Sequence, residues 1–299
     1  MVRHGVGGRT ELTAAPLRAG LDWAAAALRA PVTGVTRLTG GLTSTMLALV
    51  DATGRRSVLR LMTEEPWRTH GPGLTAREAD TLGVLADTPV PAPRSLALDA
   101  DGDAAGVSAH LMTMLPGRPA ASLDLAAVEV MAEMLATIHA VDPPEPFRHY
   151  QSWAPEVKWV VPDWTRHPDS WRRAFALLAE GPPTFEPTFL HRDHSHRNLL
   201  WRDGAVCGVV DWVETSSGPA WLDAAHAATN LAVGHHADLA RAFLAAYRER
   251  AATPYQHHWL VLDAVGFLPP PGKPPLFGSP AELARLDDWL HHVIEHAER

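Results

Sequence analysis

Side chains that could carry chemistry are concentrated in one short segment, FLHRDHSHRNLLW, at residues 189–201. It holds three histidines, an aspartate and an asparagine, namely His191, Asp193, His194, His196 and Asn198. Two chemistries could use this set. The histidines and Asp193 could hold a metal ion for hydrolysis, or Asp193 and Asn198 could serve in phosphoryl transfer.

A metal site for hydrolysis is the weaker hypothesis. Zinc needs ligands from other parts of the chain and an open position for water. The remaining histidines that could contribute repeat no ligand spacing, and they are His226, His235, His236, His257 and His258. Because the chain contains 17 histidines, a cluster can arise by chance. A metallohydrolase that uses the His191–His196 cluster remains the less favoured alternative.

The order of residues favours phosphoryl transfer. HRDHSHRN fits the pattern His-Arg-Asp, four residues, Asn, in which the aspartate acts on the acceptor hydroxyl and the asparagine holds magnesium. A second carboxylate for magnesium should follow a nearby strand. The apolar run AVCGVV ends at Asp211, thirteen residues after Asn198. We therefore predict Asp193 as the base, with Asn198 and Asp211 as magnesium ligands.

The elements around this segment divide the chain into two parts. Residues 21–30 predict a short helix, 35–62 three strands with a turn at DATGRR, 74–86 a helix, and 95–115 two more strands. A long helix with Ser122 as its N-cap follows, then a Trp- and Pro-rich stretch at 143–187. The rest is a strand pair and helices, interrupted by a Pro-rich loop at 266–280. We predict an N-terminal nucleotide-binding lobe at 1–115 and a C-terminal catalytic lobe at 116–299.

Composition limits the classes of partner. The formal net charge is -8, which disfavours nucleic acid and is compatible with a cationic small ligand. No apolar run predicts a signal peptide or a membrane span, and Cys207 is the single cysteine. We expect a cytoplasmic protein that binds a small molecule.

The C-terminal motifs resemble the aminoglycoside phosphotransferase family, which has a protein-kinase-like fold. The matching residues are His191, Asp193, Asn198, Asp211-Trp212 and Gly218-Pro219 with Asp223. The resemblance implies an α+β fold of two lobes, a small lobe with an antiparallel sheet and a larger helical lobe. It also implies that Asp223 braces the loop that carries Asp193.

The N-terminal part resembles the same family in the same order, over roughly residues 33–235. LTGGLTSTMLALV is similar to its nucleotide loop, SVLRLM to the strand with the phosphate-contacting base, TAREADTL to the helix whose Glu pairs with that base, and HLMTMLPGRP to the adenine hinge. The implied nucleotide contacts are Gly40, Gly41, Thr43, Ser44, Arg60, Glu78, Met112, Thr113 and Leu115.

Some positions depart from the family pattern or have two interpretations. Arg60 replaces the usual Lys, and a surface ion pair between Arg60 and Glu78 is the alternative to a nucleotide site. Val213 follows Trp212 where relatives often carry Glu, and Glu214 comes one place later. Candidate acceptor contacts are Glu214, Trp159 and Trp164, although the tryptophans could equally cement a helical insertion. We expect His194 and His196 to be exposed loop residues.

The resemblance implies an enzyme that moves the γ-phosphate of ATP to a hydroxyl of a small molecule with Mg²⁺. The acceptor would be an antibiotic such as an aminoglycoside, or a hydroxylated metabolite, and GTP is not excluded as donor. A protein kinase is disfavoured, because Asp211 is followed by Trp-Val rather than Phe-Gly and no Ala-Pro-Glu follows. A catalytically inactive kinase-like binding protein is the main alternative.

Overall fold

The computed structural model describes residues 15–38, 44–273 and 279–296. The chain divides into two compact units. The first comprises Met1–Ala86 and Ala92–Leu115, and the second Asp87–Pro91 and Pro116–Arg299. Gly40, Gly41 and Thr43 lie outside the described residues.

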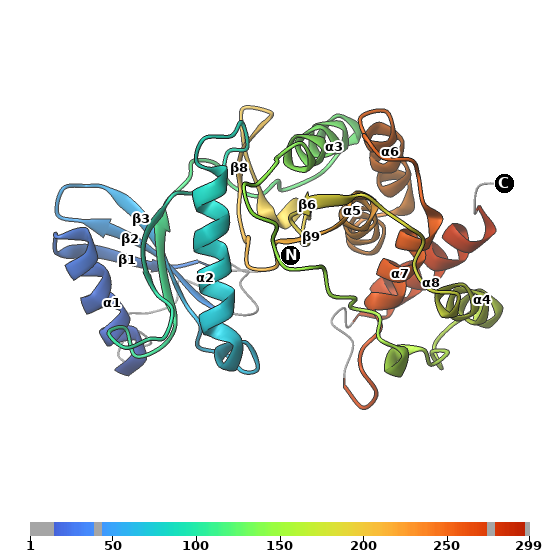
Figure 1. Ribbon diagram of the computed structural model, residues 1–299, viewed down its shortest axis with the longest axis horizontal. Coiled ribbons are helices and arrows are strands. Elements are labelled where there is room, and N and C mark those ends of the chain that lie inside the picture. Colours follow the sequence, from blue (N-terminus) through green and yellow to red (C-terminus); the bar gives the residue numbers. More distant parts are fainter. Residues whose placement is uncertain (1–14, 39–43, 274–278, 297–299) are drawn as a thin grey trace. The chain divides into compact units, whose positions relative to one another are not determined.

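The first unit is built on a five-stranded antiparallel sheet in the order β1-β2-β3-β5-β4 (Figure 1). Its strands are β1 (Val32–Arg37), β2 (Thr45–Asp51), β3 (Arg56–Leu61), β4 (Ser95–Asp99) and β5 (Ala109–Thr113). The three predicted strands at 35–62 and the two at 95–115 are thus present. Asp51 closes the β2–β3 turn, since its Oδ1 accepts from the backbone nitrogens of Thr53 and Arg55.

Helices α1 (Ala15–Leu28) and α2 (Trp67–Leu85) cover opposite faces of this sheet (Figure 1). Alternation along β3 explains the two faces. Leu59 and Leu61 belong to an apolar cluster with Ala24 and Leu28 of α1. Arg60, which lies between them, pairs with α2 instead. One face of the sheet is therefore an apolar core and the other carries buried charge.

The second unit is mainly helical. Its helices are α3 (Leu125–His139), α4 (Pro168–Ala179), α5 (Ala220–Gly234), α6 (Ala237–Arg248), α7 (His257–Gly266) and α8 (Pro280–Glu295). Two antiparallel strand pairs accompany them, β6 (Pro187–Leu190) with β9 (Ser216–Pro219) and β7 (Leu199–Arg202) with β8 (Ala205–Val209).

Helix α5 lies at the centre of this unit. Every residue from Ala220 to Val233 is buried, and α6, α7 and α8 pack around it. A helix that is apolar on most sides belongs in a core. The few polar residues on α5 consequently face other buried groups, which makes them important for the site described below.

Three details differ from the sequence expectations. Helix α1 begins at Ala15, ahead of the predicted start. Helix α3 is capped by Asp124, whose carboxylate accepts from the Ala127 nitrogen, rather than by Ser122. The β6–β9 pair was not predicted, because four-residue strands leave little local pattern when their paired residues lie far apart, as Leu190 and Ser216 do. Among the described residues, no helix is long and apolar enough to cross a membrane.

Candidate active site

The loop that follows β6 is held in a strained conformation by Asp223. Arg192 has a φ of 74°, a left-handed value that costs a non-glycine residue about 1–2 kcal/mol. The backbone nitrogens of His191 and Arg192 donate to the two Asp223 oxygens at 2.7 and 2.8 Å. Asp223 stands in the first turn of α5. The predicted bracing residue is thus in place to hold the loop.

Asp223 stays ionised although it is completely buried. Burial raises its pKa, but the hydrogen bond and charge of His139 outweigh it and lower the pKa to about 2. The other His139 nitrogen lies 2.7 Å from the Tyr247 hydroxyl. A chain of polar groups from α3, α5 and α6 therefore fixes the carboxylate.

His191 joins the loop to the end of β8. Its Nδ1 accepts from the Asp193 backbone nitrogen at 3.1 Å, so Nε2 carries the hydrogen and donates to the Val210 carbonyl at 3.1 Å. The ring packs on Trp212 with 4.3 Å between centroids. Burial lowers the pKa of His191, despite nearby carboxylates that raise it. His191 is accordingly a neutral residue that holds the Asp193 loop against the end of β8.

Asn198 and Asp211 are brought together by the β7–β8 hairpin. Leu199 pairs with Val209, and the Val210 nitrogen donates to the Asn198 carbonyl at 3.0 Å. The Asn198 side-chain nitrogen donates to the Asp193 carbonyl at 2.9 Å, which turns the amide oxygen the other way. Asp211 has a φ of 69°. An amide oxygen and a carboxylate on adjacent strand ends form a donor set suited to Mg²⁺.

Asp193 is held by a residue that the motifs did not indicate. Its Oδ1 lies 3.2 Å from His226 Nε2 on α5, and His226 Nδ1 lies 3.0 Å from Asp263 Oδ1 on α7. Burial raises the pKa of Asp193, but opposing effects, led by the His226 hydrogen bond and charge, leave the net pKa lowered. The Asp193 side chain is 34% exposed, so the ionised carboxylate is accessible to solvent.

The histidines of the motif do not form a metal site. His194 is completely buried, and its Nε2 lies 3.1 Å from the Met131 carbonyl. Burial lowers its pKa to about 3 and that of His196 to about 4. The expectation that His194 and His196 are exposed loop residues was wrong, because His194 is buried and His196 is partly buried. The position of His194 depends on α3, which approaches the loop from 63 residues earlier in the chain.

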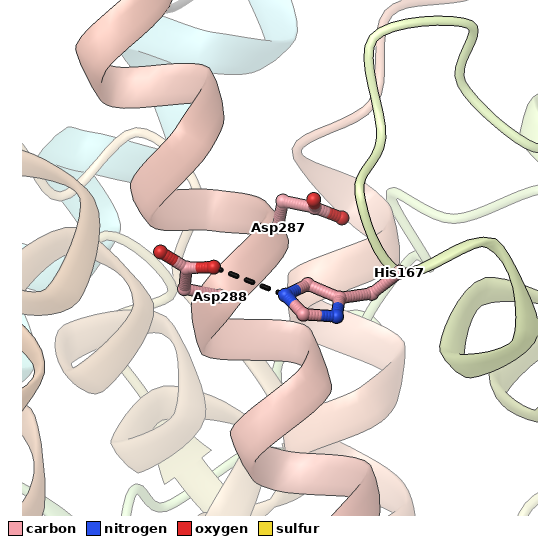
Figure 2. A group of neighbouring side chains, drawn as sticks. All are labelled: His167, Asp287 and Asp288. Atoms are coloured by element: carbon pink, nitrogen blue, oxygen red, sulfur yellow. Dashed lines mark hydrogen bonds and ion pairs between the residues drawn. The ribbon is translucent and has the colours of Figure 1, made fainter.

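Three other side chains lie close enough together to hold a metal ion, with one ligand atom of each within 4.8 Å of the others. His167, Asp287 and Asp288 are the one such group of His, Cys, Asp and Glu in the described ranges (Figure 2). The carboxylates already accept from protein donors, which are Thr165 Oγ1, the Arg166 nitrogen and Trp171 Nε1 for Asp287 and the Arg166 guanidinium for Asp288. Figure 2 shows His167 in contact with Asp288 as well. This trio fastens the 165–171 segment to α8.

In the first unit, Arg60 and Glu78 form a buried pair. Arg60 Nε and Nη2 lie 3.0 and 3.1 Å from the Glu78 oxygens, and Nη1 donates to Ser44 Oγ at 3.1 Å. His110 Nδ1 is 2.9 Å from Glu78 Oε2. Burial raises the pKa of Glu78, but the charge of Arg60 and the His110 hydrogen bond lower it to about 2. The alternative of a surface ion pair is excluded.

The predicted hinge continues β5. Met112 is buried, while Thr113 and Leu115 are partly exposed. The Thr113 nitrogen donates to the Arg94 carbonyl at 2.9 Å, and Thr113 Oγ1 accepts from the Arg94 nitrogen. The Thr113 carbonyl and the Leu115 backbone are therefore the groups that could meet a purine, and the Thr113 nitrogen is not.

The tryptophans that were candidate acceptor contacts pack against α4. Trp159 stacks parallel to Phe175 of α4, and Trp164 packs edge-on to Trp171 of α4, so both rings fasten the insertion to α4. Trp153 instead packs edge-on to His226, with the Arg192 guanidinium 4.2 Å from its ring centre.

Glu214 pairs with Arg148 at 2.5 Å, with both side chains about one-third exposed. Sequence reasoning missed His226, which contacts Asp193, and also Asp263 and Trp153, which contact His226. No local motif indicates these contacts, because His226 lies 33 residues from Asp193 and 37 from Asp263 in the sequence.

Comparison with known proteins identifies the fold and the family. A macrolide 2'-phosphotransferase from Brachybacterium faecium superposes with a TM-score of 0.60 at 19% identity, covering 83% of this chain and 90% of that one. A thermostable mutant of aminoglycoside phosphotransferase APH(4)-Ia, in complex with ADP and hygromycin B, gives 0.63 at 17% identity, covering 93% and 99%. Aminoglycoside-3'-phosphotransferase of type VIII gives 0.60 at 22% identity, covering 91% and 99%. No curated protein sequence matches.

These likenesses confirm the predicted α+β, protein-kinase-like fold. The sequence model described as "Phosphotransferase enzyme family" matches residues 34–259, which is most of the chain and includes both the Arg60–Glu78 pair and the Asp193 loop. The predicted relationship is confirmed, and the chain belongs to the phosphotransferase enzyme family.

Proposed function

We propose that this protein transfers the γ-phosphoryl group of ATP to a hydroxyl group of a small molecule. The observation that carries the proposal is the ionised, accessible Asp193 carboxylate, on a loop tied to Asn198 and to the end of β8. Phosphoryl transfer needs such a carboxylate beside oxygen ligands for a divalent cation.

Asp193 would accept a hydrogen bond from the acceptor hydroxyl and aim its oxygen at the phosphorus. The lowered pKa makes this carboxylate a weak base, so we assign it chiefly to orientation, with proton uptake late in the transfer. The Asp223 brace serves this role because it fixes the backbone that carries Asp193.

Asn198 and Asp211 would hold Mg²⁺. Their amide and carboxylate oxygens are hard ligands that suit this ion, and the hairpin brings them to adjacent strand ends. When bound, magnesium would neutralise charge on the nucleotide phosphates.

The buried Arg60 would contact the phosphates, with Glu78 and Ser44 holding its guanidinium in one orientation. Gly40, Gly41 and Thr43 remain predicted phosphate contacts. Met112, the Thr113 carbonyl and Leu115 remain predicted adenine contacts. Solved relatives contain ADP or AMP-PNP, which supports an adenine nucleotide as donor, and GTP is the alternative.

The acceptor would be a hydroxylated antibiotic or metabolite. Structural relatives include aminoglycoside and macrolide phosphotransferases, and one of them holds hygromycin B. Glu214 and Arg148 place both signs of charge on one partly exposed surface. We therefore include amino sugars, macrolides, nucleosides and amino alcohols in the candidate panel.

The test is magnesium-dependent consumption of ATP by the full chain across that panel. We expect turnover with at least one acceptor and a loss of about 10²–10⁴-fold in kcat for Asp193→Ala. Asp203→Asn is the matched control, since Asp203 lies in the exposed turn of the β7–β8 hairpin. Equal activity in wild type and Asp193→Ala would contradict the assignment.

A nucleotide-binding protein without turnover is the second candidate, favoured by Arg60 in the place of the family's usual Lys. Calorimetric titration with Mg·ATP separates the two. Tight nucleotide binding without product from any acceptor would support the inactive protein, whereas turnover excludes it.

A further inference from the structure

His226 lies between two acidic side chains at the centre of the second unit. It is 7% exposed, its Nε2 is 3.2 Å from Asp193 Oδ1, and its Nδ1 is 3.0 Å from Asp263 Oδ1. Ionised carboxylates only accept hydrogen bonds. Both ring nitrogens must then carry hydrogen if both contacts are hydrogen bonds, which makes the ring an imidazolium.

Asn230, one turn later on α5, limits the alternatives. Its side-chain oxygen accepts from Arg197 Nη2 at 2.7 Å, which orients the amide so that its nitrogen faces His226. This nitrogen donates to the His226 carbonyl at 2.9 Å and also lies 3.0 Å from His226 Nε2. A neutral ring would accept from Asn230 through Nε2 and leave Asp193 Oδ1 without this donor. The charged and the neutral His226 rings therefore differ in whether Nε2 carries hydrogen, which can be measured.

Aromatic rings pack against the imidazole. Trp153 lies edge-on with 5.1 Å between centroids, and Phe267 lies at 5.6 Å. The Arg192 guanidinium covers the Trp153 ring. Limited access of water strengthens a hydrogen bond to a charged group.

We propose that His226 is a positioning residue for phosphoryl transfer: with Asp263 fixing its ring, it holds one oxygen of Asp193 so that the other meets the acceptor hydroxyl. This inference rests on the proposed function. The protonated state is supported by the pKa of His226. Burial lowers this pKa, but Asp263 and Asp193 raise it to about 9.

Steady-state kinetics of the full chain test the role. Losing a hydrogen bond to a charged group predicts a fall in kcat of about 10–100-fold in His226→Ala. The KM values for ATP and acceptor should change little, because His226 faces Asp193 rather than either substrate. His226→Gln, which can still donate to Asp193, should recover part of kcat. His292→Gln on α8 is the matched control.

Nitrogen NMR of the histidine rings gives a readout besides activity. We expect both His226 nitrogens to carry hydrogen at pH 7.5 in the wild type and one of them to lose it in Asp263→Asn. A neutral His226 ring in the wild type would overturn the inference. Thermal unfolding of each variant shows whether it is folded, and His226→Gln with the NMR result decides the matter if His226→Ala does not fold.

The outcomes separate the two proposals. If wild type transfers no phosphoryl group to any acceptor or to water, the proposed function fails, and this inference fails with it. If wild type turns over and folded His226 variants keep full kcat, the positioning role alone is overturned.

Discussion

Two buried histidines, one in each unit, contact an acid that the motifs single out, but their second nitrogens meet different groups. His110 lies between Glu78 and the Ser95 hydroxyl, which is 2.9 Å from Nε2. His226 lies between Asp193 and Asp263. A hydroxyl can donate or accept, whereas an ionised carboxylate only accepts, so the two contacts of His226 require hydrogen on both of its ring nitrogens.

The cations beside the two acids also differ. Glu78 pairs with Arg60, whose charge is permanent in the accessible pH range. Asp193 is paired with a histidine, which can titrate. The charge that we propose contacts phosphate is therefore insensitive to alkaline pH, whereas the histidine that supports the proposed base can lose its charge.

The largest expected effect on stability comes from removing the carboxylate that pairs with Arg60. Glu78→Gln leaves the Arg60 charge buried without its carboxylate, which should cost roughly 3–5 kcal/mol of unfolding free energy. Urea denaturation measures it, with Asp80→Asn on the exposed face of α2 as control. An unchanged midpoint in Glu78→Gln would show that the pair is not what holds this face of the sheet.

Asp223→Asn should have the next largest effect. One carboxylate oxygen becomes an amide nitrogen that cannot accept from the His191 or Arg192 backbone, so the strained loop loses a partner. We expect the free energy of unfolding to fall by about 1–3 kcal/mol. We also expect kcat to fall in the variant that remains folded, because the loop that carries Asp193 is no longer held in place. Asp238→Asn, in the first turn of α6, is the control. Full kcat in a folded Asp223→Asn protein would refute the brace.

The pH dependence of stability separates the two cations. The pKa of Glu78 is lowered from 4.5 to about 2, so its contribution is complete above 4.5 and is lost as the pH falls through about 2. The pKa of His226 is raised from 6.5 to about 9, so its contribution is complete below 6.5 and is lost as the pH rises through about 9.

Thermal unfolding between pH 2 and 10 should therefore show an acid limb that Glu78→Gln reduces and an alkaline limb that His226→Gln reduces. An alkaline limb of the same size in wild type and His226→Gln would show that His226 does not cause it.

The smallest effect is expected at the partly exposed pair of Arg148 and Glu214. Arg148→Ala should cost about 0.2–1 kcal/mol, since solvent screens the pair. Arg172→Ala at the exposed Asp169 contact is the control. A change in the KM for the acceptor without a change in stability would show that the pair contacts the acceptor. A loss of unfolding free energy well above 1 kcal/mol would show that the pair is structural.

Local patterns in the sequence predicted much of the molecule. The five strands of the first unit followed from apolar alternation and turn residues. The kinase-like fold and the phosphotransferase family followed from the resemblance of several motifs, in order, to a known family. These features are readable because each is set by residues within a few positions of one another. The juxtaposition of Asn198 and Asp211 was also foreseeable, since one short hairpin joins them.

Only the tertiary structure decided what surrounds the motifs. His194 is buried because α3 packs on its loop, and Trp153 rather than Trp159 or Trp164 reaches the His226 ring. Asp193 meets His226, and His226 meets Asp263, because a central helix is packed on several sides. Contacts between groups more than 30 residues apart depend on helix packing, and local spacing carries no record of it.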